Sequence, residues 1–312
     1  MDTMLPPVPK NQHYVWRYYL EAWAVDDLLA CYRQRDRKPI RTNPKNIASQ
    51  TYFYRVPALS EAELNYLELV IANRPDEGAR QVHRNFVKLF QMPAKVRQIV
   101  ERHGRPDVRA ASEALLDHAD RSLGERYQVG IENKGLPLLE RLKARDAAFW
   151  KDGSGIDDFL FFIANQYLRT ARMQNLIARI TAPPGVDLGK VWSIERHIWA
   201  TEIGAALLRE RERYRAVILV NRTRIPFITG DQPVINLNPS RARDVKLYYP
   251  VRPDTALLLT TDDYAPDGAK EISAFDAERY NYEMYRWSDD QIYGLDTAYL
   301  AEVCALDKMP LP

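Results

Sequence analysis

The sequence predicts an α+β fold in which a sheet built from both ends of the chain packs against a central helical block. Aromatic and β-branched residues gather in short runs near both ends, which is typical of strands. Between these ends, apolar residues recur at helical spacing. We therefore expect a single domain over residues 1–312. Its expected parts are N-terminal strands, a helical block, and C-terminal strands with a helix, at residues 1–56, 60–212 and 216–312.

The N-terminal strands and the helical block follow from local signals in the order of the chain. Ser60 and Glu63 have the spacing of a capping box, and they precede apolar residues at helical intervals. The sequence Ala182-Pro183-Pro184-Gly185 ends the strongest helical pattern. The predicted elements are strands at 28–34 and 51–56 and helices that start at Ser60, cover 82–90, lie within 107–149, and cover 156–180 and 188–212.

The C-terminal part changes from helical to strand periodicity after Tyr214. Two apolar runs flank the polar residues 221–224, and this arrangement predicts a hairpin over 217–229 with largely buried strands. The remaining predicted elements are strands at 246–249 and 256–260, a helix at 275–288 and a last short strand at 291–293.

Composition excludes several classes of protein. The 44 basic and 42 acidic residues give a net charge of +2, which argues against a strongly basic nucleic-acid coat protein. The two cysteines, Cys31 and Cys304, are too few for a disulfide framework and are expected to be reduced. The residues from Met1 to Pro9 do not resemble a secretory signal, and no apolar run is long enough to cross a bilayer. We therefore expect a cytoplasmic protein without a membrane partner.

Polar side chains in otherwise apolar segments are the candidates for chemistry, because a buried polar group is costly unless it is paired or used. His13, flanked by Asn11 and Gln12, suits general acid–base work, or it is simply bonded to the backbone. Asp231 follows a buried run at the start of a polar turn, where an aspartate serves either a site or the turn itself. His197 lacks the second histidine of a zinc-binding pair and is expected to be structural.

Three polar residues interrupt the apolar pattern of the predicted helix 156–180. Gln166, Arg169 and Arg172 recur every three residues and fall close to one stripe of that helix. Guanidinium groups fixed on a rigid helix could clamp a phosphate or carboxylate with two hydrogen bonds. The alternative is a buried ion pair with an acidic partner in the core.

Several short motifs resemble the bacterial "domain of unknown function 4238" family, in matching order over nearly the whole chain. The opening Asn11-Gln12-His13-Tyr14-Val15-Trp16-Arg17-Tyr18-Tyr19-Leu20 is similar to its N-terminal signature, although Trp16 replaces the usual proline. Further similar segments are 46–48, 166–170, 226–234 and 249–251. Gly230 replaces the serine that the family usually has beside the aspartate. The resemblance implies no established reaction, but its motifs include His13, Gln166, Arg169 and Asp231.

The first functional hypothesis is a hydrolase that acts on a phosphate-containing substrate, either nucleic acid or a nucleotide. His13 would be the general acid or base, Arg169 would stabilise developing charge, and Asp231 would orient His13 or hold a divalent cation. Its substrate contacts would be Asn11, Gln12, Gln166 and Arg172. The alternative is a non-enzymatic binding or regulatory module in which these polar residues form a structural network. A transferase that uses a nucleotide donor needs a similar site, and the sequence does not separate it from a hydrolase.

Overall fold

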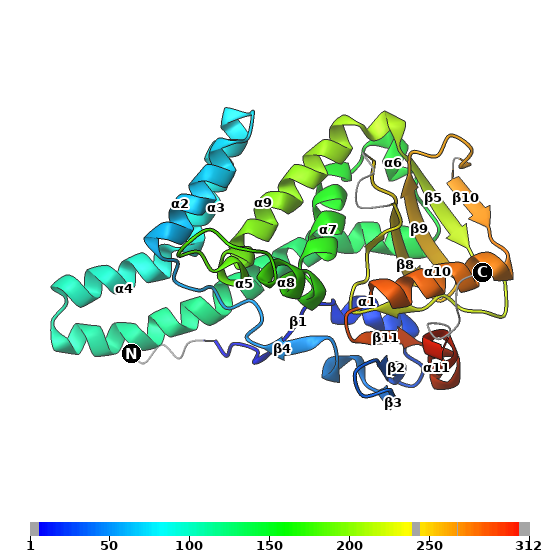
Figure 1. Cartoon of the computed structure of the whole chain (residues 1–312), viewed down its shortest axis with the longest axis horizontal. Helices are drawn as coiled ribbons and strands as arrows, with labels where there is room; N and C mark the ends of the chain where they lie inside the picture. The colour runs from blue at the N-terminus through cyan, green and yellow to red at the C-terminus, as the bar shows by residue number, and fades with distance from the viewer. Residues whose placement is uncertain (1–5, 239–243, 267, 306–312) are drawn as a thin grey trace. The chain divides into compact units, whose positions relative to one another are not determined.

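The computed structural model in Figure 1 describes residues 6–238, 244–266 and 268–305, so part of the start analysed above, residues 1–5, lies outside it. The chain divides into two compact units that interleave along the sequence, and each is described by itself below. The first unit takes residues up to 12, 50–130 and 173–200, and the second takes 13–49, 131–172 and 201 onward. The expectation of a single domain stays a prediction.

Helices make up most of the first unit. They are α2 (Glu61–Ala72), α3 (Glu77–Phe90), α4 (Met92–His103), the first part of α5 (Pro106–Lys143), most of α8 (Ala171–Ala178) and the first part of α9 (Leu188–Arg209). The capping box predicted at Ser60 and Glu63 is confirmed, because each side chain accepts a hydrogen bond from the other residue's backbone N–H. A core centred on Leu67, Phe90 and Ile194 holds these helices together.

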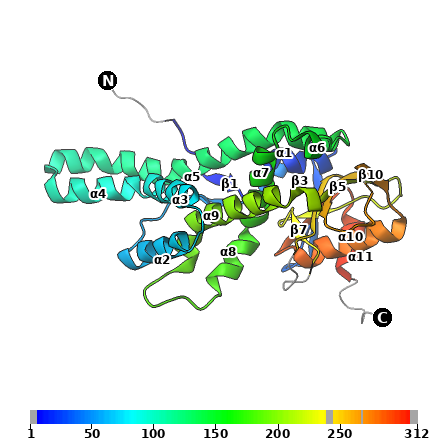
Figure 2. The same ribbon diagram turned by 90° about the horizontal axis from the view of Figure 1, so that it is seen from above.

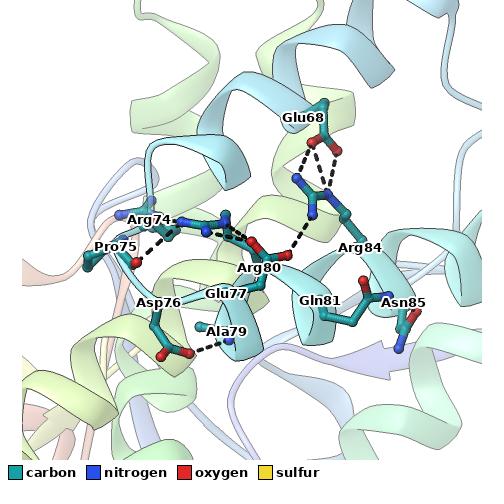
Figure 3. A network of polar contacts seen from close by, with 10 residues as sticks. All are labelled: Glu68, Arg74, Pro75, Asp76, Glu77, Ala79, Arg80, Gln81, Arg84 and Asn85. Atoms are coloured by element: carbon teal, nitrogen blue, oxygen red, sulfur yellow. Dashed lines mark hydrogen bonds and ion pairs between the residues drawn. The ribbon is translucent and has the colours of Figure 1, made fainter.

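Ion pairs on the surface of the first unit fix the connection between α2 and α3, as Figure 3 shows. The Arg84 guanidinium on α3 donates to Glu68 on α2, with a shortest distance of 2.7 Å. Asp76 caps α3 by accepting from the Ala79 N–H at 2.7 Å. Exposed pairs of this kind contribute little to the free energy of unfolding, so their main effect is on the orientation of α3 relative to α2. Figure 2 shows α4 beside the first part of α5, where Arg97 bonds Asp120 at 2.9 Å.

Two sheets form the framework of the second unit. The five-stranded sheet has the order β10-β5-β9-β8-β7, and the four-stranded sheet has the order β3-β2-β11-β6. Only the pairing of β10 with β5 is parallel in these two sheets. The strands are β2 (Leu29–Arg33), β3 (Lys38–Thr42), β5 (Arg215–Val220), β6 (Thr229–Gly230), β7 (Ile235–Asn236), β8 (Leu247–Arg252), β9 (Thr255–Thr260), β10 (Gly268–Glu271) and β11 (Gln291–Gly294).

The α+β fold is confirmed, and its four-stranded sheet combines strands from both chain ends as predicted. The expectation of one shared sheet was too simple, because the C-terminal part alone supplies five strands for the other sheet. A third, two-stranded sheet pairs β1 (Asn11–His13) with β4 (Ser49–Thr51). Helix α10 (Ala274–Trp287) packs its Ala277, Tyr280 and Met284 side chains into the core under the five-stranded sheet (Figure 1).

The remaining elements of the described chain are short helices and two longer ones of the second unit. These are α1 (Arg17–Leu20), α6 (Phe149–Asp152), α7 (Ile156–Leu168), α11 (Thr297–Ala305), and 3-10 helices at Glu21–Trp23, Pro44–Asn46 and Arg211–Arg213. The 3-10 helix Glu21–Trp23 is anchored by Trp23, which is fully buried and donates its indole N–H to the Phe227 carbonyl at 2.8 Å.

Several sequence-based predictions of elements are wrong. The strand predicted at 51–56 does not form, because β4 ends at Thr51 and residues 52–54 make a turn. Two further predictions are wrong for identifiable reasons. The hairpin over 217–229 does not form, since β5 pairs with β9 and β10 and the next strand, β6, belongs to the other sheet. Asn221 causes this, because its side chain binds the Thr223 N–H and the Ile225 carbonyl and turns the chain out of the sheet. The helix predicted over 156–180 is broken into α7 and α8 at Arg169 and Thr170.

Helix α5 continues through Gly135 and Pro137, two residue types that usually interrupt a helix. Gly135 explains part of this behaviour. A Cβ atom added there would lie 2.2 Å from the Phe162 ring, whose side chain is fully buried on α7. The glycine therefore allows α5 and α7 to approach closely. Gly130 on the same helix has no atom within 4 Å of an added Cβ.

These two glycines provide a matched pair for a stability measurement. Alanine is favoured over glycine inside a helix by about 1 kcal/mol, so Gly130→Ala should raise the free energy of unfolding by that amount. Gly135→Ala should instead lower it by roughly 1–3 kcal/mol, because the Phe162 ring must move in a filled core. Denaturant titration of both variants measures the effect, and stabilisation by Gly135→Ala would show that α5 and α7 do not meet here.

Candidate functional site

Asp231 lies at the end of β6 and is held by the backbone of the segment that leads into β11. Its carboxylate accepts the N–H groups of Asp289 at 2.7 Å, Asp290 at 2.8 Å and Gln291 at 2.8 Å. Its own N–H donates to the Gln291 carbonyl at 2.9 Å, and the residue is only 2% exposed. Both carboxylate oxygens are therefore engaged in joining β6 to the start of β11.

The electrostatics of Asp231 follow from its burial and these bonds. Burial raises its pKa to about 6, while the three amide donors act in the opposite direction. At pH 7.5 the group is thus ionised, and its charge is met by amide dipoles. Within the described residues, no hydrogen bond or ion pair joins Asp231 to His13 or to Arg169.

Arg169 lies at the end of α7 and is fully buried. Its guanidinium donates to Glu132 on α5 at 2.7 Å, and the Glu132 side chain is 14% exposed. Burial raises the pKa of Glu132 and the Arg169 charge opposes that shift. This contact matches the buried ion pair that the sequence offered as the alternative to a phosphate clamp.

His13 ends β1 and is half-buried. Its Nε2 atom lies 3.3 Å from the Pro44 carbonyl oxygen. Burial lowers the pKa of His13, and the positive charges of Arg17 and Arg169 lower it further. The imidazole is therefore mainly neutral at pH 7, and it lies within electrostatic range of Arg169.

Electrostatic effects on neighbouring groups are the interactions that relate the three candidates for catalysis. Besides burial, the charge of Asp231 raises the pKa of Tyr14, the residue that follows His13. The pKa of the buried Tyr249 is raised by burial, with Arg169 opposing the shift. These effects place His13 near Arg169, and Tyr14 near Asp231. Their convergence on one open site stays a prediction.

The four residues expected to contact substrate have different surroundings. Gln12 is fully buried in the first unit, where it accepts the Tyr54 N–H at 2.7 Å and donates to the Arg121 carbonyl at 3.1 Å. Arg172 lies over the Trp287 ring and donates to the Ser288 carbonyl at 3.3 Å. Gln166 is 1% exposed, and its Nε2 has no partner among the described residues. Asn11 is exposed.

Sequence reasoning missed the structural importance of Gln232. Its side chain donates to the Tyr167 and Val234 carbonyls at 2.9 and 2.8 Å and accepts from the Thr170 hydroxyl at 2.5 Å. It therefore binds the end of α7 to the turn after β6. The available signal was its amide next to Asp231, ahead of Pro233 in an apolar segment, which calls for internal partners.

Gly230 is required by the packing beside Asp231. A Cβ atom at this position would lie 2.0 Å from the Ser288 hydroxyl oxygen, which itself donates to the Met284 carbonyl at 2.8 Å. The Ser288 side chain is buried at the end of α10. A hydroxyl is therefore present next to Asp231, but it comes from residue 288.

Neither a metal cluster nor a candidate membrane span emerges from the described part of the chain. No group of three or more His, Cys, Asp or Glu side chains there is arranged to hold a metal ion. None of the described helices combines the length and the apolar character that a bilayer crossing requires. Cys31 and Cys304 form no disulfide among the described residues, and burial raises the pKa of Cys31 to about 12.

Three cavities, of about 630, 480 and 200 Å³, open among the described residues. None of the seven sequence-predicted site residues lines them. Of these seven residues, Gln12, Gln166, Arg169 and Asp231 are buried, whereas Asn11 is exposed.

The structural function of Asp231 can be measured by unfolding. We expect Asp231→Asn to lower the free energy of unfolding at pH 7.5 by roughly 3 kcal/mol, because the amide offers one acceptor where the carboxylate offers two. The exposed Asp263→Asn is the control and should change stability by less than about 0.5 kcal/mol. Equal stability of the two variants would show that the amide bonds to Asp231 contribute nothing.

His197 was expected to be structural, and its pKa provides a test with a defined sign. The residue is 3% exposed, lies 4.9 Å from the Tyr127 ring centroid, and has its pKa lowered well below 6.5, first by burial and then by Arg196. Only the unfolded chain takes up this proton near pH 6.5, so acidification below that value favours unfolding by up to about 1.4 kcal/mol per pH unit. His197→Gln should remove this part of the pH dependence, whereas the exposed His103→Gln should retain it. Stability measured from pH 7.5 to 5 compares them, and identical slopes would contradict the assignment.

Comparison with known proteins agrees with the motifs in the sequence. No curated protein and no solved structure matches the chain. A family model described as "Protein of unknown function (DUF4238)" matches residues 11–298, which include β1, the end of α7 and the Asp231 turn. The chain therefore belongs to the DUF4238 family.

Proposed function

We propose that this protein is a non-enzymatic binding or regulatory module in which the polar set around Asp231 and Arg169 is structural. The observation that supports this proposal most is the Asp231 carboxylate, which accepts three backbone N–H groups. A carboxylate that acts as a base or as a metal ligand needs an accessible oxygen lone pair. Use of Asp231 in either way would require the segment 289–291 to give up part of its hydrogen bonding.

The ion pair of Arg169 with Glu132 supports the same proposal. The fully buried guanidinium already holds the Glu132 carboxylate at 2.7 Å, and a substrate phosphate would have to enter the core beside that carboxylate. Leaving Glu132 without its cation would be costly, because an unpaired buried charge is strongly destabilising. Arg169 is thus better suited to joining α7 and α5 than to holding a ligand that comes and goes.

A hydrolase of a phosphate-containing substrate, nucleic acid or nucleotide, is the second candidate. One observation favours it: the half-buried His13 has a lowered pKa and lies within range of two cations, Arg17 and Arg169. A neutral imidazole beside positive charge suits a general base acting on an anionic substrate. Asn11, one of the predicted substrate contacts, lies on β1 with His13 and is exposed.

The buried ion pair gives a direct test of the structural proposal. Arg169→Met and Glu132→Leu should each lower the free energy of unfolding by roughly 3–5 kcal/mol, because each leaves one buried charge unpaired. The double variant should recover most of that loss. The matched control is the exposed pair Lys134–Asp158, which joins α5 to α7 at 3.0 Å and whose removal should have little effect. Failure of the double variant to recover would show that the two residues are not coupled.

Activity measurements separate the two candidate functions. The binding-module proposal expects no phosphate release or strand cleavage by the wild-type protein on nucleotides, RNA and DNA, with and without divalent cations. It also expects His13→Ala to alter the melting temperature, while phosphate release and strand cleavage stay absent as in the wild type. A reaction catalysed by the wild type and lost in a folded His13→Ala variant would instead establish the hydrolase.

A further inference from the structure

A cavity of about 480 Å³ in the first unit has the composition of a ligand site. The segment that follows β4 forms one part of its lining, and the first turns of α9 form another. None of its lining residues belongs to the motifs that suggested chemistry from the sequence. Its volume falls within the range of roughly 300–1,000 Å³ that small-molecule sites occupy.

The aromatic part of the lining comes from Tyr52, Phe53 and Trp192. The backbone around Tyr52 is held in place, because the Tyr52 N–H donates to the Lys10 carbonyl at 2.8 Å. Gln12 fixes the next turn by accepting the Tyr54 N–H at 2.7 Å. Gln12 is therefore a positioning residue for this cavity. The result is an ordered aromatic wall on which a planar ring could stack.

Trp192 adds an unpaired donor to this lining. Its side chain is 3% exposed, and its indole N–H has no hydrogen-bond partner among the described residues. A buried donor left in this state costs about 1–3 kcal/mol. Trp192 borders the cavity, although its indole nitrogen is itself buried in the wall.

The charged part of the lining has three cations, Arg55, Lys190 and Arg196, and one carboxylate, Asp187. Asp187 is committed to the helix, because it accepts the Lys190 N–H at 3.2 Å. Lys190 is 46% exposed, and its ammonium lies 3.9 Å from Glu63, which leaves donors for another anion. The positive end of the α9 dipole adds to the attraction for negative charge at this position.

Arg196 differs from the other two cations because it is 4% exposed. Its guanidinium lies over the Tyr54 ring at 5.1 Å and donates to the His197 ring at 3.3 Å. These contacts fix its position in the wall. A fixed guanidinium is well suited to a phosphate, since its donors are arranged before the ligand arrives.

We infer that this cavity binds a nucleoside phosphate. The base would stack in the aromatic part, while the phosphates would be held by Lys190 and Arg196 at the start of α9. A nucleoside phosphate uses both parts, whereas a simple anion uses only the cations and a neutral aromatic uses only the rings. This inference assigns a ligand class and a binding site to the module proposed above. It rests on that proposal in one respect, namely that the bound nucleoside phosphate is not hydrolysed.

Isothermal titration of the full chain with nucleoside diphosphates, adenosine and pyrophosphate tests the inference. Nucleoside diphosphates should bind more tightly than either of the other two probes. Lys190→Glu should weaken their binding about tenfold or more through the loss of an ion pair, and Trp192→Ala by a few-fold through the loss of part of the aromatic lining. Lys151→Glu is the matched control, because Lys151 lines the other large cavity, and it should leave affinity unchanged.

Melting temperatures show whether each variant is folded, and Lys190→Ala serves if the glutamate variant is not. Three results would each overturn the inference. Lys151→Glu could weaken binding as much as Lys190→Glu, pyrophosphate could bind as tightly as the nucleoside diphosphates, or only oligonucleotides could bind. Absence of nucleotide binding would also overturn it while leaving the module proposal intact. Release of phosphate from a bound nucleotide would overturn the module proposal and leave the site assignment standing.

Discussion

The four-stranded sheet depends on one buried negative charge. The Asp231 carboxylate holds the N–H groups of three consecutive residues, 289–291, at the point where α10 has ended and β11 begins. Strand β11 then pairs with β6 on one side and with β2 on the other. A charge this deeply buried is tolerated because three backbone N–H groups stabilise it. The residue thus fixes the register by which the two ends of the chain meet.

The neighbouring polar groups extend this arrangement to the helices. Gln232 continues from Asp231 and binds the Tyr167 carbonyl and the Thr170 hydroxyl, so the end of α7 is set by the same turn. Arg169, between those two residues, joins α7 to Glu132 on α5. Side chains that resemble a catalytic set in the sequence therefore act in the structure as connections between elements. Hydrogen bonds between buried polar groups are effective in this way because a different packing would leave those groups unpaired.

Features with local causes could be predicted from the sequence. The capping box at Ser60 and the strand at 256–260 depend on residues a few positions apart, and both form. Strand β10 could not be predicted, because all four of its residues are exposed and give no apolar pattern. The hydrogen bonds of Asp231 could not be predicted from the sequence either, since its partners lie 58–60 residues later in the chain. The cavity at the start of α9 also required the structure, because it combines side chains from distant segments.

The contact of Gly230 with Ser288 constrains how this sequence could have diverged from its family. A side chain at 230 and the serine at 288 would occupy the same space, since an added Cβ lies 2.0 Å from the Ser288 hydroxyl oxygen. If a serine stands at 230, as the resemblance to the family implies for its members, the Ser288 hydroxyl must move to make room for its Cβ. The two positions are therefore epistatic, and relatives are expected to fill one of them or the other with a hydroxyl. An alignment of the family would display this exchange as a pair of columns that vary together.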